Sequence, residues 1–315
     1  MISTSQAFAE LPALYYPHLA GLADAVLREW PEHRAFLSKR FRDSSPELNH
    51  IAERMAQVIL AGPSADALGQ YCRDYRNTCE LIIAEELYFR RSGRYRNTSF
   101  KEVRHQIYDN PAVMKPYLNG LLLAQPLWLN HVRVHAAFEA FLDGLADGVT
   151  LAEVGPGHGL LLCTAARRSH IHRLIGWDIS ASSLDAARRT LAAAGLGDRV
   201  TLEQVDVRDI DGAAEAIDTC VISEVLEHLE DPGETLRGLW RRLRPGGRIF
   251  INVPINSPAP DHIYLWTSPE EFTEFVAGSN FSVEAVKLFP ATGYELESAL
   301  RRRLTISVVV CGARL

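Results

Sequence analysis

The sequence predicts an α/β fold, in which a mostly parallel sheet carries helices on both faces and follows an α-helical domain. From Thr150 onward, strand-like and helix-like segments alternate, as they do in parallel sheets with crossover helices. A glycine-rich turn follows the first of these strands. In residues 1–147, by contrast, alternating strand patterns are nearly absent. We therefore predict two domains, with residues 1–147 helical and residues 148–315 α/β.

The composition is that of an ordinary globular protein. The chain has 315 residues, of which 47% are hydrophobic and 23% charged, enough to bury the core of two domains or one large one. Its formal net charge of -6 does not favour a nucleic-acid partner. The five scattered cysteines form no C-x-x-C pair, which argues against a disulfide framework or a zinc knuckle. Because neither a signal-peptide pattern nor a membrane-spanning stretch is visible, we expect a cytoplasmic, reduced and soluble protein. The sequence leaves a homodimer open.

Helical periodicity dominates the first half of the chain, in segments joined by short turns. Asn110 followed by Pro111 is a strong helix start, because asparagine caps the helix and proline tolerates its first position. The predicted helices cover residues 19–30, 46–61, 65–91, 100–108, 111–123 and 127–145.

Two features of this half are candidates for function. His131 and His135 lie four residues apart, which places both imidazoles on one helix face and could hold a metal. Because no carboxylate or third ligand is near in sequence, we expect hydrogen-bonded or solvated histidines and no metal. The second feature is a gathering of aromatic and polar residues, a composition found in small-molecule pockets and equally in helix interfaces. Its members are Tyr88, Phe89, Tyr95, Tyr108, Tyr117, Asn119, Gln125 and Trp128.

The α/β half is organised around residues 149–162, which read VTLAEVGPGHGLLL. A short apolar strand leads into glycines at alternate positions, Gly155, Gly157 and Gly159, and a helix-compatible segment follows over residues 160–166. A strand, a glycine turn and a helix start form the geometry in which a backbone closes on a nucleotide-like ligand. Glycine is needed because a side chain would block that approach or forbid the required dihedral angles.

The spacing of the glycines distinguishes between nucleotides. In a dinucleotide fingerprint, Gly-x-Gly-x-x-Gly, the third glycine would stand at Leu160, one residue later than it does here. Glu153 precedes the first glycine by two positions, and its carboxylate repels a pyrophosphate but suits a cationic ligand. S-adenosylmethionine is such a ligand, because it carries an ammonium and a sulfonium and no phosphate. The run Glu153-Val154-Gly155-Pro156-Gly157-His158-Gly159 resembles the first motif, E-x-G-x-G-x-G, of the class I S-adenosylmethionine-dependent methyltransferases.

Asp178 ends the second predicted strand, residues 173–177. It lies about 20 residues beyond the glycines, where nucleoside-binding α/β folds place a carboxylate on the ribose. Two ribose hydroxyls that donate to one carboxylate form charge-assisted bonds of about 1.5–3 kcal/mol each. A cap for the helix over residues 180–191 is the structural alternative. Because the run that starts with Asp178 and Ile179 is also similar to the family pattern, both residues are predicted to contact the donor.

The resemblance extends to the third and fourth strands, residues 200–205 and 219–222. After the third strand come Asp206 and Val207; in the family an acid here accepts from the adenine amino group and the next apolar residue packs on the ring. The fourth strand opens into Ser223, which is predicted to contact the donor. The segment Ser223-Glu224-Val225-Leu226-Glu227-His228-Leu229-Glu230-Asp231-Pro232 resembles the VLEHL-x-DP segment of the ubiquinone-biosynthesis-like branch of the family.

Three further strands complete the implied sheet. The fifth, residues 248–253, follows the turn Leu243-Arg244-Pro245-Gly246-Gly247, which resembles the L-x-P-G-G turn of the family. Residues 281–288 and 305–311 supply two more strands. The resemblance, which covers residues 150–311, implies a Rossmann-like seven-stranded sheet whose last strand is antiparallel.

Methyl transfer from a sulfonium is an in-line displacement on an activated donor, so alignment of the reactants can supply roughly 7–11 kcal/mol. A base is needed only where the nucleophile must lose a proton. Glu224 and His228 follow the fourth strand, and Asp261 and His262 follow the fifth, at the strand ends where ligands bind. His228 is the preferred base, although a role in packing is equally open. Glu224 is a candidate for donor or amine binding, and His262 for substrate contact.

The acceptor is a small molecule in this interpretation. Residues 223–226 do not match the Asp/Asn-Pro-Pro-aromatic motif of amino-directed DNA methyltransferases, and the negative net charge also disfavours DNA. We expect the helical half to cover the donor and enclose an acceptor of quinone or secondary-metabolite type, methylated at O, N or C. Two alternatives remain open. One is an NAD(P)-dependent oxidoreductase, which Leu160 and Glu153 disfavour, and the other is a non-catalytic protein that binds S-adenosylmethionine.

Overall fold

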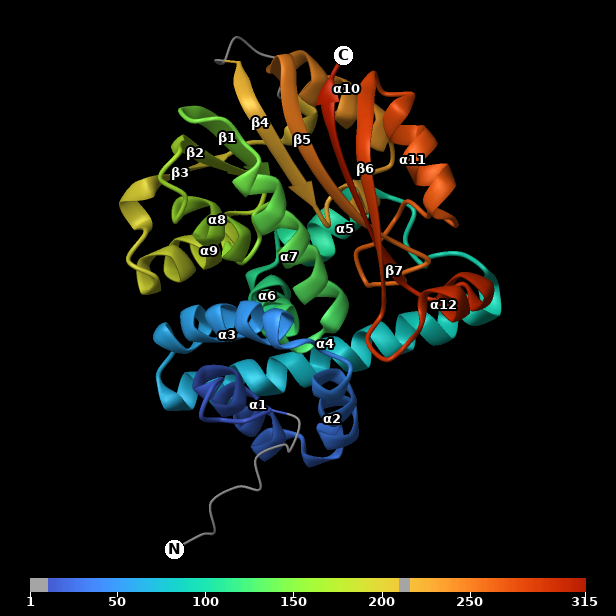
Figure 1. The fold of residues 1–315 in the computed structure, drawn as a ribbon. Helices are drawn as coiled ribbons and strands as arrows, with labels where there is room; N and C mark the ends of the chain where they lie inside the picture. Colours follow the sequence, from blue (N-terminus) through green and yellow to red (C-terminus); the bar gives the residue numbers. More distant parts are fainter. Residues whose placement is uncertain (1–10, 210–215) are drawn as a thin grey trace, which may run out of the picture.

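The computed structural model describes residues 11–209 and 216–315. Figure 1 shows a sheet with helices on both faces and the N-terminal helices α1 to α4 gathered at one end of it. The α-helices within these ranges are α1 (Pro17–Glu29), α2 (Arg34–Arg42), α3 (Pro46–Ala61), α4 (Ala65–Ser92), α5 (Phe100–Val103), α6 (Pro111–Leu127), α7 (Leu129–Asp143), α8 (Leu160–Ala166), α9 (Ala181–Ala193), α10 (Pro232–Arg242), α11 (Pro269–Ala277) and α12 (Leu296–Arg302).

The sheet has seven strands among the described residues, in the order β3-β2-β1-β4-β5-β7-β6. β1 to β5 pair in parallel, whereas β7 runs antiparallel to both β5 and β6. The predicted α/β class, with a mostly parallel sheet and an antiparallel last strand, is therefore confirmed. The strands are β1 (Val149–Val154), β2 (Ile171–Asp178), β3 (Val200–Gln204), β4 (Ile217–Ser223), β5 (Leu243–Ile255), β6 (Phe281–Pro290) and β7 (Ile306–Arg314).

Apolar side chains alternate between the two faces of the sheet, as the pleat requires. Leu151, Val221 and Phe250 join a core that also holds buried residues of α1, α3, α7 and α8. Ala152 and Ile222, their neighbours in sequence, join a second core with α10 and α11 on the opposite face. The first core is shared by the N-terminal helices and the sheet. The domain boundary at residue 147 stays a prediction.

The structure differs from the prediction at three places. Helix α2 (Arg34–Arg42) was not predicted, because it carries too many charged residues for an apolar stripe to stand out. The helix expected over residues 100–108 exists, but its second part, Arg104–Tyr108, is π-helical. The predicted turn before the fifth strand lies inside β5: Leu243 pairs with Ile217 and Arg248 with Thr219, so the intervening residues bulge out.

Within the described ranges, we find no helix with both the length and the apolar character needed to cross a membrane. The five cysteines all lie in those ranges and are free, in agreement with the expectation of no disulfide framework.

Candidate active site

Two adjoining cavities lie at the carboxyl ends of the parallel strands. The first, of about 780 Å³, is bounded by Trp177 from the sheet and Phe100 from the helical half. The second, of about 840 Å³, is bounded by Asn252 from the sheet and Gln125 from α6. Because strand order reverses between β1 and β4, this edge is where doubly wound sheets open a crevice. The residues that line both cavities are Tyr117, Leu118, Leu121, Gly155, Gly157, Glu224, His228 and Asp261.

The glycine loop adopts a backbone conformation that glycine accepts without strain. The φ angle is 64° at Gly155, 51° at Gly157 and 82° at Gly159. A Cβ at Gly155 would lie 2.4 Å from Val225 Cγ2, and one at Gly159 would lie 2.9 Å from Ala187 Cα in α9. At Gly157 the nearest atom would be 3.9 Å away, and this residue borders both cavities. The loop therefore packs tightly at its ends and leaves its middle open to a ligand.

Asp178 is buried at the end of β2 and lines the first cavity. Its Oδ1 accepts from the Ser180 N–H at 2.8 Å, and its Oδ2 accepts from the Gly157 N–H at 3.4 Å. Helix α9 is capped by Ser180, whose side chain accepts from Ser183 N. Burial raises the pKa of Asp178 to about 6, against the effect of these backbone bonds. The carboxylate is thus tied to the glycine loop and has lone pairs left for a ligand.

Ile179, Asp206 and Val207 also line the first cavity. The carboxylate of Asp206 accepts from both Nη2 and Nε of Arg208, at 2.6 and 2.9 Å, and these bonds lower its pKa. An adenine amino group would therefore share the Asp206 oxygens with Arg208.

The remaining predicted donor contacts are divided between the cavities. Pro156, Ser223 and Glu153 line the second cavity, as does the predicted substrate contact His262. Gly159 lines neither cavity and is the residue from which α8 begins. The sequence thus predicted one site, and the structure distributes its residues over two connected spaces.

Two glutamates line the second cavity, Glu153, which is buried, and Glu224, which is half-buried and also borders the first cavity. Glu153 is 3% exposed and its Oε2 has no hydrogen-bond partner among the described residues. Burial raises the pKa of Glu153 to about 8, with a further contribution from the charge of Asp178. Burial also raises the pKa of Glu224 to about 7, although its Oε1 accepts from Asn252 Nδ2 at 2.7 Å. Glu224 has a φ of 56°, a left-handed conformation that costs energy outside glycine.

His228 connects the loops that follow β4 and β5. Its Nδ1 lies 3.0 Å from the carbonyl oxygen of Asp261, and its Nε2 lies 3.1 Å from that of Glu224. Both ring nitrogens are therefore occupied by backbone acceptors. This arrangement favours the packing role over that of a free base, and the catalytic role stays a prediction.

Asp261 joins the helical half to the loop after β5. The hydroxyl of Tyr117 donates to Asp261 Oδ1 at 2.9 Å, and that of Tyr108 donates to Oδ2 at 3.2 Å. Burial and the Asp261 charge raise the pKa of both tyrosines. Two tyrosines of the helical half and an aspartate of the α/β half are thus brought together in the lining of the first cavity.

The histidines of the helical half are neutral donors or acceptors. His131 Nδ1 lies 3.0 Å from Gln125 Nε2, and His135 Nε2 lies 2.7 Å from Thr164 Oγ1. Burial lowers the pKa of His131 to about 4 and that of His135 to about 3. Both line the second cavity together with His158, whose pKa burial lowers to about 3. Each has one hydrogen-bond partner, and within the part of the chain described neither belongs to a group of three metal-binding side chains.

Sequence reasoning assigned no role to three polar residues of this region. Asn252 interrupts an apolar strand, a signal that could have marked it, and lines the second cavity. His158 lies inside the glycine motif, which was interpreted from its glycines and Glu153. Glu227 precedes His228 and is wholly buried. Its burial could not be predicted, because other charged residues lie near it in the sequence. Of the aromatic and polar group in the helical half, Tyr108, Tyr117 and Gln125 line the two cavities.

Comparisons with known proteins agree with this geometry. A family described as "Methyltransferase domain" matches residues 152–251. The chain is 30% identical to a ubiquinone biosynthesis O-methyltransferase of Caulobacter vibrioides over 197 residues, which cover 53% of the chain and 76% of the relative. It is also 30% identical to a trans-aconitate 2-methyltransferase of Azoarcus sp. over 164 residues, 51% of the chain and 60% of the relative.

Other relatives are matched over a smaller part. A ubiquinone biosynthesis O-methyltransferase of Neisseria meningitidis is 29% identical over 139 residues, 43% of the chain and 57% of the relative. The chain thus spans less than two thirds of the Neisseria and Azoarcus proteins. Among solved structures, the N-methyltransferase NodS of Bradyrhizobium japonicum in complex with S-adenosyl-l-homocysteine is similar in fold. Its TM-score is 0.50 at 16% identity, and the match covers 69% of this chain and 99% of that one.

Proposed function

This chain belongs to the class I S-adenosylmethionine-dependent methyltransferases, and we propose that it transfers the methyl group of S-adenosylmethionine to a small molecule in the second cavity. The observation that carries the proposal is the junction of the cavities at the glycine loop. A donor in the first cavity would present its sulfonium at this junction, next to an acceptor in the second. Such proximity is the main requirement of an in-line displacement.

The first cavity suits an adenosine group. Trp177, Ile179 and Val205 offer apolar surface to the purine, and Asp178 offers acceptor oxygens to the ribose hydroxyls. The open middle of the glycine loop, at Gly157, lets the methionine part pass toward the second cavity. Acidic side chains at the junction, Glu153 and Glu224, complement the positive sulfonium and ammonium groups.

The acceptor is proposed to be neutral or cationic and to carry hydroxyl or amino groups. No lysine or arginine lines either cavity among the described residues, so nothing there would neutralise an anion such as the trans-aconitate in the name of one relative. The second cavity instead offers acceptors, since Asn252 Oδ1 is buried without a donor. The names of the ubiquinone biosynthesis relatives favour oxygen as the methylated atom.

The chemical step needs alignment and, for a hydroxyl, removal of one proton. The acceptor oxygen bonds to the methyl carbon while the carbon–sulfur bond breaks, and that bonding pair goes to sulfur, which becomes a neutral thioether. We assign the proton to Glu224, because it borders both cavities and its pKa of about 7 suits a base near neutrality. His228 is proposed to position the two loops, and His262 to contact the acceptor.

Calorimetry with S-adenosylmethionine, S-adenosylhomocysteine and NADH tests the donor site. We expect micromolar binding of the first two ligands and none of NADH. Asp178→Ala should weaken donor binding at least about 100-fold, because it removes the acceptor of two charge-assisted bonds. Asp185→Ala is the matched control, since this exposed acid of α9 pairs only with Arg188 in the described structure. Normal donor binding by Asp178→Ala would refute the site assignment.

The transfer itself is tested separately, by following labelled methyl groups from the donor into small hydroxy and amino compounds. Labelled product would support the proposed reaction. Donor binding without transfer to any acceptor of this class would instead favour the non-catalytic alternative. Binding of NADH in place of the donor would favour the oxidoreductase.

A further inference from the structure

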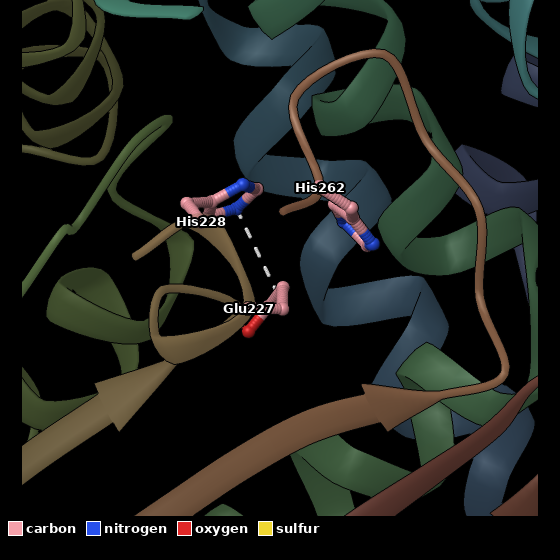
Figure 2. A group of neighbouring side chains, drawn as sticks. All are labelled: Glu227, His228 and His262. Carbon is pink, nitrogen blue, oxygen red and sulfur yellow. Dashed lines mark ion pairs between the residues drawn. The ribbon is translucent and has the colours of Figure 1, made fainter. Parts of the chain in front are cut away.

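Three side chains with metal-binding atoms meet between the loops that follow β4 and β5. Glu227 and His228 belong to the turn Leu226–His228, and His262 belongs to the segment after β5. One ligand atom from each lies within 4.8 Å of the others. Figure 2 shows the carboxylate of Glu227 below the ring of His228, with the ring of His262 beside them. No metal was predicted from the sequence, in which His131 and His135 were the candidate metal ligands.

The hydrogen bonds of the two histidines leave a lone pair on each ring. His262 Nδ1 lies 2.6 Å from the carbonyl oxygen of Ser257, which can only accept, so the proton is on Nδ1 and Nε2 carries a lone pair. His228 has a carbonyl oxygen near each ring nitrogen, that of Asp261 at 3.0 Å from Nδ1 and that of Glu224 at 3.1 Å from Nε2, so a metal on Nε2 requires the tautomer with its proton on Nδ1. Metal-binding histidines have this pattern, with the second nitrogen donating to a backbone carbonyl.

In this tautomer, His228 Nε2 faces only electron pairs. It lies 3.1 Å from the Glu224 carbonyl oxygen and 3.8 Å from Glu227 Oε1. A cation bound to Nε2 would remove the repulsion between these electron pairs, as would a proton on Nε2.

Glu227 is the strongest indication that something is bound. Its side chain is 0% exposed, and neither Oε1 nor Oε2 has a hydrogen-bond partner among the described residues. Its backbone is nevertheless held firmly, because the Glu227 carbonyl accepts from the N–H groups of Ile263 and Tyr264 at 2.8 and 2.9 Å. Glu224 and Asp261 lie close enough for their charges to raise the pKa of Glu227 further, beyond the effect of burial. A buried carboxylate normally has a donor, a counterion or a metal.

We propose that Glu227, His228 and His262 form a binding site for a divalent transition-metal ion. Ligand atoms at a tetrahedral angle and about 2.1 Å from Zn²⁺ lie about 3.4 Å apart, so the cluster, whose ligand atoms lie within 4.8 Å of one another, would contract around an ion. Two imidazoles with one carboxylate favour Zn²⁺, Co²⁺, Fe²⁺ or Mn²⁺ over Ca²⁺, which prefers six to eight oxygen ligands. Three protein ligands leave further coordination positions open.

The position of this site suggests its use, which rests on the proposed function. His228 and His262 line the second cavity, so an ion on them would border the space assigned to the acceptor. A hydroxyl bound to the ion would have a lower pKa and would lose its proton to Glu224 more readily. The ion would also supply the positive charge that the lining of the two cavities lacks.

Metal binding by the full chain can be measured without donor or acceptor. Protein is stripped with a chelator, and Co²⁺ and Mn²⁺ are titrated while the Co²⁺ absorption bands and the Mn²⁺ spin-resonance signal are followed. We expect one ion per chain, with Co²⁺ bands that indicate nitrogen ligands. Glu227→Gln and His262→Gln should each weaken binding by more than the roughly 10–100-fold caused by loss of a supporting hydrogen bond.

The matched control is His131→Gln, at a half-buried histidine of the second cavity outside the cluster, and this variant should bind the ions as the unaltered chain does. Donor binding by calorimetry verifies that each variant is folded and tests the proposed function independently. Absence of stoichiometric binding by the unaltered chain would overturn the metal site. Equal affinity in Glu227→Gln, His262→Gln and His131→Gln would overturn it as well.

Discussion

Glu153→Gln should make the stability of the ligand-free protein less dependent on pH. Glu153 stands at the end of β1, 3% exposed, with Oε2 lacking a partner in the described structure. Burial and the charge of Asp178 raise the pKa of Glu153 from 4.5 to about 8. Glutamine has nearly the same shape and no charge to lose, so the substitution removes the titration and disturbs the packing little.

The sign and size of the effect follow from proton linkage. Between the unfolded pKa of 4.5 and the folded pKa of about 8, the folded protein holds a proton that the unfolded chain has released. The contribution of Glu153 to the free energy of unfolding is therefore fully present below pH 4.5. It is lost as pH rises through the folded pKa of about 8, at about 1.4 kcal/mol per pH unit. Five histidines whose pKa values burial lowers change stability in the opposite direction, as pH falls through their ordinary pKa of 6.5, and they do so in both the unaltered chain and Glu153→Gln. From pH 6.5 to 8, Glu153 alone should lower the free energy of unfolding by about 1–2 kcal/mol.

Urea unfolding of the ligand-free protein at several pH values in this window measures the effect. The unaltered chain should lose more stability than Glu153→Gln over the same range, and Glu224 should contribute equally to both. Glu297→Gln serves as the control, because the Glu297 side chain is 92% exposed and should leave the slope unchanged. Parallel pH profiles for the unaltered chain and Glu153→Gln would show that Glu153 is ionised in the folded state, and would refute the reasoning.

Two further substitutions test the framework of the site by urea unfolding. Gly159→Ala should lower the free energy of unfolding by about 2–4 kcal/mol, because Gly159 has a positive φ and an added Cβ would press against Ala187. Gly195→Ala should lower it by only about 1–2 kcal/mol, because Gly195 has a similar φ but open space around it. Equal costs would contradict the packing argument. Asp261→Ala should lower the free energy of unfolding by about 2–5 kcal/mol, because it leaves the hydroxyls of Tyr108 and Tyr117 without their hydrogen-bond acceptor. In a Tyr117→Phe background this cost should shrink, and an unchanged cost would show that the bonds contribute nothing.

The strands and the glycine loop could be predicted because local patterns specify them. Most of the parallel strands contain a short apolar run, and Gly155, Gly157 and Gly159 mark the turn by their spacing alone. Helix α2 escaped prediction because one of its core residues is charged. Arg40 is wholly buried and donates to Asn49 Oδ1 at 2.7 Å and to the Pro126 carbonyl at 2.9 Å. No periodicity of apolar residues signals a buried arginine that is hydrogen-bonded to residues of two other helices.

The candidate site could be predicted in part, where its residues lie beside strands that the sequence marks. Asp178 and Glu153 were identifiable because they flank strands whose ends the sequence marks. The group of Glu227, His228 and His262 was not, because it requires the loops after β4 and β5 to meet. That meeting depends on the hydrogen bond between His228 and the Asp261 carbonyl and on those of Ile263 and Tyr264 to Glu227. Contacts between loops leave no periodic trace in a sequence.

The charges of the site connect its folding to its binding. Glu153, Asp178 and Glu227 are buried and Glu224 is half-buried, and each has a raised pKa. No lysine or arginine lines the cavities in the described ranges. In the ligand-free protein, protons therefore supply the positive charge that these carboxyls need. A sulfonium donor or a divalent ion would supply it instead and displace the protons. Binding of either ligand is then coupled to proton release. The pH dependence of the binding affinity gives the number of these carboxyls that lose a proton when the ligand binds.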